Sequence, residues 1–302
     1  GGVTGYTNDN TPLLNLSSTN AYQMKFSCDS TNWTSNEAYA TTKSSFDVNS
    51  GSNGCTAADG SKTVYAVFRD QAGNAATAVY TDAFVLDHIA PVPSLSSPAN
   101  GFRYSSPDPS LVSTHVEATA GLQKCFARIG TGNPPSSPTR IVQGSISSND
   151  CTFSGYSALT EGIYYWDVNA MDKAGNWSAY SNTRSIVRDN TAPTVPSTFI
   201  IETDSTSPYW DKVNNSKTDL GFTALESGET CKWNLTNVVY TSLANGCTVS
   251  GVDVNCAFGN LTQTSTAGQY LARYHACVDD VNNAYATQGI NFGIDWTAPT
   301  TS

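Results

Sequence analysis

Apolar and polar residues alternate in short runs along this chain, and the apolar positions show no helical spacing. Near the start, Thr11–Ser17 and Tyr22–Cys28 both alternate, which predicts half-buried β-strands. Lys62–Arg69 is a stronger run of the same kind, and a Gly73-Asn74 turn leads from it back through Ala78–Leu86. Two such runs on either side of a turn predict a β-hairpin.

The same order of strands recurs twice further along the chain. The predicted strands there are Ser110–Glu117, Leu122–Ile129, Ile163–Met171 and Asn182–Val187, and then Thr218–Ala224, Glu229–Trp233, Gln269–Val278 and Gly289–Ile294. Short strands separated by turns are typical of antiparallel sandwiches made of two sheets. The expected fold class is therefore all-β.

Two motifs recur together and set the period of the chain: an Asp-x-Ala-Gly-Asn turn, and an Asp-x-x-Ala-Pro linker 16 or 17 residues later. The turns are Asp70–Asn74, Asp172–Asn176 and the divergent Asp279–Asn283, and the linkers are Asp87–Pro91, Asp189–Pro193 and Asp295–Pro299. Repeats of this length indicate tandem domains. We expect three, at residues 1–87, 88–189 and 190–302, the last with a tail at 296–302.

Composition narrows the classes of function. Only 13% of the 302 residues are charged and the formal net charge is −10, which argues against nucleic-acid binding because phosphate contacts need clustered Lys and Arg. No apolar run approaches the length of a membrane-spanning helix. The eight cysteines are even in number and lack zinc-site spacing, which predicts disulfides and an extracellular or periplasmic location.

The chain resembles tandem bacterial and archaeal immunoglobulin-like domains. The residues that carry the resemblance are Met24–Trp33, the Asp-x-Ala-Gly-Asn turns and the Asp-x-x-Ala-Pro linkers. Such domains build large surface proteins, adhesin stalks and filament subunits. The resemblance implies an immunoglobulin-like fold and an extracellular scaffold, but no particular ligand.

The spacing of the cysteines suggests how they pair. Cys28 and Cys55, Cys125 and Cys151, and Cys231 and Cys256 are separated by 27, 26 and 25 positions, which favours these three as equivalent bridges and leaves Cys247 with Cys277. For the third domain, pairing by proximity in sequence is the rival: Cys231 with Cys247, and Cys256 with Cys277. Each bridge is expected to stabilise the fold, by roughly 3–4 kcal/mol.

Aspartates gather at the expected domain junctions. In an immunoglobulin-like arrangement Asp87 faces the turn that begins at Asp172, and Asp189 faces Asp279 and Asp280. Related adhesin domains hold calcium at such junctions, and calcium takes about six to eight oxygen ligands. The alternative is that these side chains only accept hydrogen bonds within their own turns. Both interpretations stay open at this point.

The first domain has a shorter lead-in than the other two, and a further copy of the linker follows the third. One explanation is a segment of a longer periodic chain with flanking domains. The other is that the tail of one copy completes the first domain of the next by β-strand addition, which would give a head-to-tail homopolymer. The contact residues would be Gly1, Thr11, Asp295, Trp296 and Pro299.

Several Asn-x-Ser/Thr sequons lie in or beside predicted turns, where an N-linked glycan could be accommodated. Their number is what chance would give for this composition. The candidate glycosylation sites are Asn32, Asn176, Asn214, Asn234 and Asn260.

No nucleophile, metal-protease or phosphate-binding motif is present, so the sequence does not predict an enzyme. The expected function is structural: a subunit or segment of an extracellular filament, pilus-like fibre or stalk. The alternative is a cell-surface adhesin module that binds a glycan or a host surface. A strip of exposed Trp in a single domain would favour the adhesin.

Overall fold

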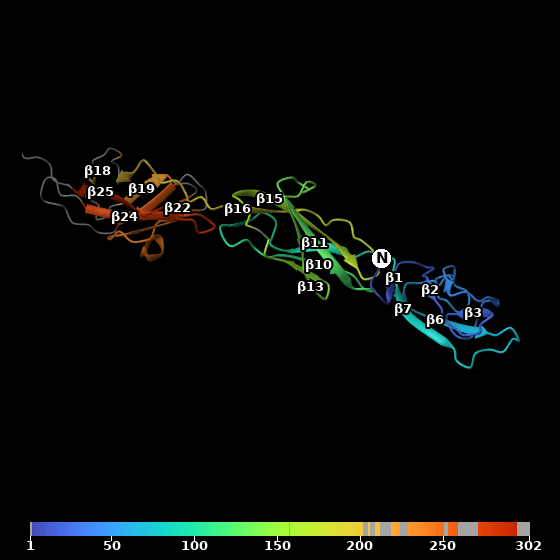
Figure 1. Cartoon of the computed structure of the whole chain (residues 1–302). Helices are drawn as coiled ribbons and strands as arrows, with labels where there is room; N and C mark the ends of the chain where they lie inside the picture. Colours follow the sequence, from blue (N-terminus) through green and yellow to red (C-terminus); the bar gives the residue numbers. More distant parts are fainter. Residues whose placement is uncertain are drawn as a thin grey trace, which may run out of the picture. The chain divides into compact units, whose positions relative to one another are not determined.

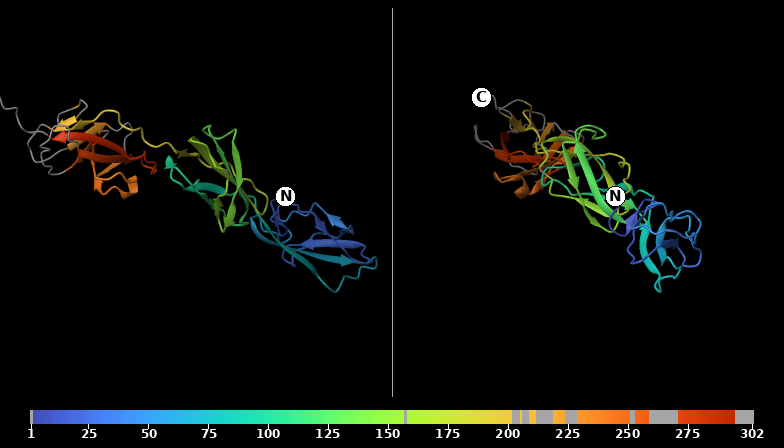
Figure 2. Two further views of the ribbon diagram at one scale, coloured as in Figure 1. Left: turned by 60° about the vertical axis from the view of Figure 1, so that its left-hand side comes forward. Right: turned by 45° about the vertical axis from the view of Figure 1, so that its right-hand side comes forward.

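A computed structural model describes residues 2–156, 158–201, 205, 209–211, 219–223, 229–250, 253–258 and 271–294. The described residues form strands and loops throughout (Figure 1; Figure 2). The helical element among them is a short 3-10 turn at Tyr240–Ser242, and no helix there is long and apolar enough to cross a membrane. The chain is therefore all-β, as the alternating pattern predicts.

By spatial contact the chain separates into two compact units. Unit 1 comprises Gly1–Phe102, Pro109–Ala158 and Ile163–Ile186, and unit 2 comprises Arg103–Asp108, Leu159–Gly162 and Val187–Ser302. The predicted boundaries at residues 87 and 189 stay a prediction. We call the three intervals that they define the first, second and third segments.

The first segment, within unit 1, has a five-stranded sheet opposite a two-stranded one. The larger sheet runs β1 (Tyr6–Thr7), β7 (Tyr80–Leu86), β6 (Gly60–Arg69), β3 (Gln23–Ser27) and β4 (Glu37–Ala38), and the smaller pairs β2 (Leu14–Asn15) with β5 (Thr42–Lys43). Alternate residues of β3 and β6 point inward, and Phe26, Val48 and Leu86 are fully buried between the layers.

The second segment is a sandwich of a four-stranded and a five-stranded sheet. The first runs β13 (Ser145–Ser147), β14 (Asp150–Phe153), β10 (Leu111–Val116) and β8 (Val92–Ser97); the second runs β12 (Arg140–Gln143), β11 (Leu122–Gly130), β15 (Gly162–Asp172), β16 (Arg184–Arg188) and β9 (Phe102–Tyr104). Trp166 on β15 is fully buried in its core, together with Phe153 and Ile186.

The third segment, within unit 2, repeats this arrangement. One sheet runs β17 (Ile200–Ile201), β19 (Asp219–Thr223), β23 (Asp253–Ala257) and β22 (Thr248–Ser250); the other runs β18 (Tyr209–Asp211), β25 (Gln288–Ile294), β24 (Leu271–Val278), β20 (Thr230–Asn234) and β21 (Asn245–Gly246). Immunoglobulin-like sandwiches thus account for the described strands.

The sandwiches are antiparallel, as expected, but two strand pairs at sheet edges are parallel. β1 runs parallel to β7, with Tyr6 opposite Val85, and β18 runs parallel to β25, with Tyr209 opposite Phe292. An early strand of the segment lies here beside the last strand, and both run toward the same end of the sandwich. Alternation of side chains predicts a strand but not the direction of its neighbour, so the sequence could not show this.

Candidate functional site

The repeated turn has the same structure in all three segments. The backbone N–H of Asn74, Asn176 and Asn283 donates to the Oδ1 atom of the Asp four residues earlier, at 2.9, 2.8 and 2.8 Å. Their side-chain amides donate to the other oxygen of the same carboxylate, at 2.9, 2.8 and 2.9 Å. The first and last residues of the motif, Asp and Asn, therefore stabilise the turn through two hydrogen bonds to one carboxylate.

The fourth residue of the turn is in the left-handed region, with φ of 89° at Gly73, 100° at Gly175 and 70° at Asn282. Glycine adopts this conformation without strain, and asparagine is among the few other residues that tolerate it. The divergent third copy of the motif therefore forms the same turn as the other two.

In unit 1 the turn of the second segment holds the end of β7. The amide Nδ2 of Asn176 donates to the main-chain oxygen of Asp87 at 2.8 Å, while its Oδ1 accepts from Nδ2 of Asn8 at 2.9 Å. The Oδ2 atom of Asp87 accepts from the backbone N–H of Ala120 at 3.0 Å. We call this set of contacts the first junction.

Three carboxylates converge at the first junction. One oxygen from each of Asp87, Glu117 and Asp172 lies within 4.8 Å of the others. Asp87 and Asp172 are fully buried and Glu117 is half-buried. The sequence pointed to the two aspartates but not to Glu117, because this residue directly follows β10 and belongs to neither repeated motif.

The carboxylates of the first junction accept hydrogen bonds from backbone N–H groups but have no ion-pair partner among the described residues. Burial raises the pKa of Asp87, and the neighbouring charges of Glu117 and Asp172 raise it further, against the N–H groups of Ile89 and Ala120. Among the described residues, no Lys or Arg forms an ion pair with any of the three carboxylates. Hard oxygen donors without a cationic side chain fit calcium, to which these carboxylates and nearby main-chain carbonyls would be the ligands.

In unit 2 the turn of the third segment holds the end of β16 in the same way. Nδ2 of Asn283 donates to the main-chain oxygens of Asp189 at 3.0 Å and Thr191 at 3.3 Å. The hydroxyl of Ser105 donates to the main-chain oxygen of Val281 at 3.2 Å. We call this set the second junction.

An arginine neutralises the second junction. Nη2 of Arg103 lies 2.6 Å from Oδ2 of Asp189, and its Nε lies 2.9 Å from Oδ2 of Asp280. Both oxygens of Asp279 accept hydrogen bonds within its own turn, as those of Asp172 do at the first junction, so the arginine is what distinguishes the two junctions. The guanidinium of Arg103 already supplies the positive charge that a calcium ion would bring. We therefore do not extend the calcium interpretation to Asp189, Asp279 and Asp280.

The structure pairs the cysteines of the first two segments as their spacing predicts, as Cys28–Cys55 and Cys125–Cys151. Cys125 lies on β11 and Cys151 on β14, so their bridge joins the two sheets of the second segment.

In the third segment both pairings considered from sequence are wrong, since the bridges are Cys231–Cys277 and Cys247–Cys256. Cys231 on β20 lies directly opposite Cys277 on β24, where the second segment has Ala170 opposite Cys125. The Thr248–Asn255 register likewise sets Cys247 opposite Cys256. Sequence separation does not reveal which residues face one another across a ladder.

The candidate glycosylation sites differ in exposure and in the hydrogen bonds of their side chains. Asn32 is exposed, and Asn234 is half-buried at the end of β20. Both N–H hydrogens of the Asn176 amide are engaged, one by Asp87 and one by Asp172, so a glycan there would break a junction bond. Asn214 and Asn260 lie outside the described residues.

Of the expected subunit contacts, the structure describes only Thr11. Its N–H and hydroxyl both donate to Oδ1 of Asp9, at 2.8 and 3.1 Å, in a local turn. Gly1, Asp295, Trp296 and Pro299 lie outside the described residues.

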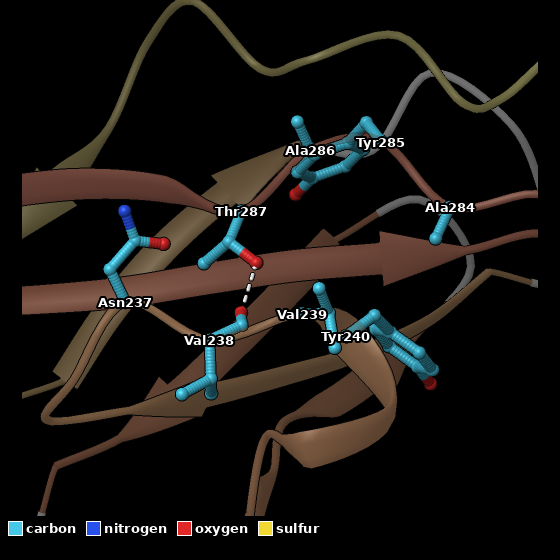
Figure 3. A pocket seen from close by; sticks show the side chains of 8 residues that line it. All are labelled: Asn237, Val238, Val239, Tyr240, Ala284, Tyr285, Ala286 and Thr287. Atoms are coloured by element: carbon cyan, nitrogen blue, oxygen red, sulfur yellow. Dashed lines mark hydrogen bonds between the residues drawn. The ribbon is translucent and has the colours of Figure 1, made fainter.

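A pocket of about 630 Å³ opens in the third segment (Figure 3). Its described lining is Asn237, Val238, Val239, Tyr240, Ala284, Tyr285, Ala286 and Thr287. The hydroxyl of Thr287 donates to the carbonyl oxygen of Val238, and the hydroxyl of Tyr285 lies against His275 and Cys277. This lining presents no carboxylate, amine, imidazole or thiol that would carry chemistry.

The described Trp side chains do not form an exposed strip within one segment. Trp166 and Trp233 are buried, Trp33 is half-buried under Lys25, and Trp177 is exposed but stacked on Phe126. The feature that would favour a glycan-binding adhesin is therefore not found among the described residues.

No protein-family model matches the chain, and no curated protein matches it either. Solved structures with a similar fold include part of a 1.5-MDa bacterial ice-binding adhesin (13% identity, 91% of this chain and 86% of that one, TM-score 0.38) and the chicken CNTN1 FN1–FN3 domains (10%, 95% and 95%, 0.36). A tetra-tandem repeat from the extending region of a large adhesion protein is also similar (16%, 96% and 72%, 0.29). These likenesses are distant, and the fold assignment above rests on the sheets themselves.

Proposed function

We propose that this chain is a structural segment of an extracellular fibre or stalk, built from immunoglobulin-like modules that join end to end. One observation carries the proposal: the turn Asn of one segment donates to the main-chain oxygen of the preceding segment's terminal Asp, at Asp87 and again at Asp189. A contact to a main-chain oxygen is independent of the side chains around it, so it can recur at every junction of a periodic assembly.

Four disulfides support an oxidising, extracellular location. Head-to-tail association of copies would extend the same junction beyond one chain, which is how a heterologous contact generates a filament. The four bridges also suit a load-bearing role, because each limits how far its segment can be extended.

We also propose that calcium occupies the first junction, held by Asp87, Glu117 and Asp172. The support is the buried and unneutralised charge of these carboxylates, which a divalent cation would compensate. Bound there, the cation would stiffen the connection between the first and second segments.

Small-angle X-ray scattering of the purified chain tests the structural proposal. We expect the wild type to scatter as a stiff particle, and the double variant Asn176→Ala/Asn283→Ala to show a broader distribution of end-to-end distances. The matched control is Asn74→Ala, which removes the same residue from a turn that joins no described segment. Equal flexibility of the wild type and the double variant would contradict a role for the junction bonds.

A further inference from the structure

The two sheets of the third segment are held together differently from those of the second. In the second segment the Cys125–Cys151 bridge joins β11 to β14, across the two sheets. In the third, the Cys231–Cys277 bridge joins β20 to β24 within one sheet, and the Cys247–Cys256 bridge joins residues nine positions apart beside the edge strand β22. Packing of side chains therefore holds β24 against β19 of the opposite sheet, with no disulfide between these strands.

Two ionisable side chains lie in this core, on the inward face of β24. Counting back from the first Asp of each repeated turn aligns His275 with Val168 and Arg273 with Trp166. All four side chains are buried, and His275 and Arg273 are 1% and 7% exposed. The second segment thus fills these two positions with apolar side chains, whereas the third places an imidazole and a guanidinium between its sheets.

The imidazole of His275 packs across the interface against the opposite sheet. Its ring centroid lies 5.0 Å from that of Phe222 on β19 and 5.2 Å from that of Phe199. Its Nδ1 lies 3.0 Å from the hydroxyl oxygen of Tyr285, which donates to Sγ of Cys277 at 3.2 Å. Because the hydroxyl proton is used on the sulfur, Nδ1 carries the ring proton and donates to Tyr285. Nε2 is then the unprotonated nitrogen.

A proton taken up by this ring must therefore go to Nε2. That atom is buried and has no hydrogen-bond partner among the described residues. A charged group buried without an acceptor or a counter-charge is unfavourable, so the protonated ring is stable only where Nε2 can reach water.

The titratable groups around His275 do not offset a positive charge on it. Arg273 lies two residues away on the same face of β24, over aromatic rings at 5.6 to 6.0 Å and with no ion pair in the described part of the chain. Tyr285 stays neutral, because burial and then the charge of Glu229 raise the pKa of its hydroxyl. The Glu229 carboxylate is buried beside the sulfurs of the Cys231–Cys277 bridge and does not contact Nε2.

The burial of His275 couples folding to pH. It lowers the pKa of this ring from 6.5 to about 4. Between these values the unfolded chain binds a proton that the folded chain does not. The free energy of unfolding is therefore unaffected by His275 above pH 6.5, and falls as the pH is lowered from 6.5 to about 4.

We propose that the third segment is an acid-sensitive module, in which protonation of His275 at Nε2 drives its two sheets apart. The imidazolium finds no acceptor at the interface and has the like charge of Arg273 beside it, so it is stabilised only when β24 separates from β19. The Cys231–Cys277 bridge lies within one sheet and does not oppose this opening. The Cys125–Cys151 bridge does oppose it in the second segment. This property is independent of the proposed stalk role.

Hydrogen exchange of the full chain, measured by mass spectrometry on peptides from β19 and β24, tests the proposal. At each pH between 7 and 4, comparison of the wild type with His275→Gln and His275→Val cancels the pH dependence of intrinsic exchange. Relative to both variants, the opening equilibrium constant of the wild type should rise as the pH falls from 6.5 to 4, approaching about tenfold per pH unit. A constant difference in stability between the proteins does not change this slope.

The matched control is His115→Gln, which removes the other buried imidazole, on β10 of the second segment. Peptides of the third segment should keep the wild-type slope in this variant. NMR titration of His275 in the folded wild type, which needs no substitution, should show a neutral ring at pH 5. Equal slopes in the wild type and the His275 variants, loss of the slope in His115→Gln, or a ring that is protonated near pH 6.5 while the third segment stays closed would overturn the proposal.

Discussion

The two junctions make the same main-chain contact but handle charge in opposite ways. At both, a turn Asn donates to the main-chain oxygen of the preceding terminal Asp. At the first, three carboxylates meet without a basic partner in the described part of the chain; at the second, Arg103 bridges Asp189 and Asp280. The contact that joins the segments is thus separate from the means by which each junction is stabilised.

The difference has a physical consequence. Buried carboxylates that are not paired destabilise the folded state unless they take up a proton or a cation. The first junction therefore depends on solution conditions, whereas the second carries its own counter-charge.

The largest expected effect is that of calcium on the first junction. A ligand that binds only the folded state at a hundred times its dissociation constant stabilises by about 2.7 kcal/mol. Calcium should therefore raise the unfolding temperature of the wild type but not of Glu117→Gln, measured by calorimetry against chelator. Arg103→Ala should keep the calcium response, and loss of the response in that variant would contradict the assignment to the first junction.

The next largest change in the free energy of unfolding should come from removing the side-chain amide of a junction Asn. Asn176→Ala loses the bonds to Asp87 and Asp172 and leaves a buried carbonyl without its donor, at a cost of about 1–3 kcal/mol. Asn283→Ala should have a similar effect. Asn74→Ala, at the exposed turn, should stay within about 0.5 kcal/mol of the wild type. Denaturant titration measures all three, and equal effects would show that the bonds stabilise only their own turns.

Arg103→Ala should have a smaller effect, confined to the second junction. The side chains of Arg103 and Asp280 are 41% and 50% exposed, so solvent screens this part of the network and its loss should cost about 0.5–1 kcal/mol. The cost should shrink as salt is added. A cost that did not depend on salt would mean that Arg103 acts through packing.

The smallest expected effect is a pH dependence of stability in chelator. The folded pKa of Asp87 is raised above 3.8, so the folded state holds this proton after the unfolded chain has released it. Protonation of Asp87 therefore adds to the free energy of unfolding in full below pH 3.8, and this stabilisation is lost as the pH rises through the folded pKa. Denaturant midpoints between pH 4 and 7 should fall for the wild type relative to Asp87→Asn. A constant difference between the two proteins would contradict the shift.

The repeat made much of this arrangement predictable. The Asp-x-Ala-Gly-Asn spacing located each turn, and the Asp-x-x-Ala-Pro linker located the residues that the turns contact, because both features depend on residues close together in sequence. Even the divergent Asn282 is understandable, since its left-handed conformation is one that asparagine tolerates.

Contacts between distant residues could not be predicted in the same way. Glu117 and Arg103 lie outside the repeated motifs and reach the junctions only through the fold. The bridges of the third segment depend on which residues face one another across a ladder, and the parallel pairing of β1 with β7 depends on strand direction. Neither property is encoded in the alternation of side chains.

The most direct test of the difference between the junctions is a spin-label distance measurement across each of them, with and without calcium. Labels at the exposed residues Ser50 and Ser147 span the first junction, and labels at Ser147 and the exposed Thr248 span the second. We expect calcium to narrow the first distribution of distances and to leave the second unchanged. A response at both junctions, or at neither, would contradict the account.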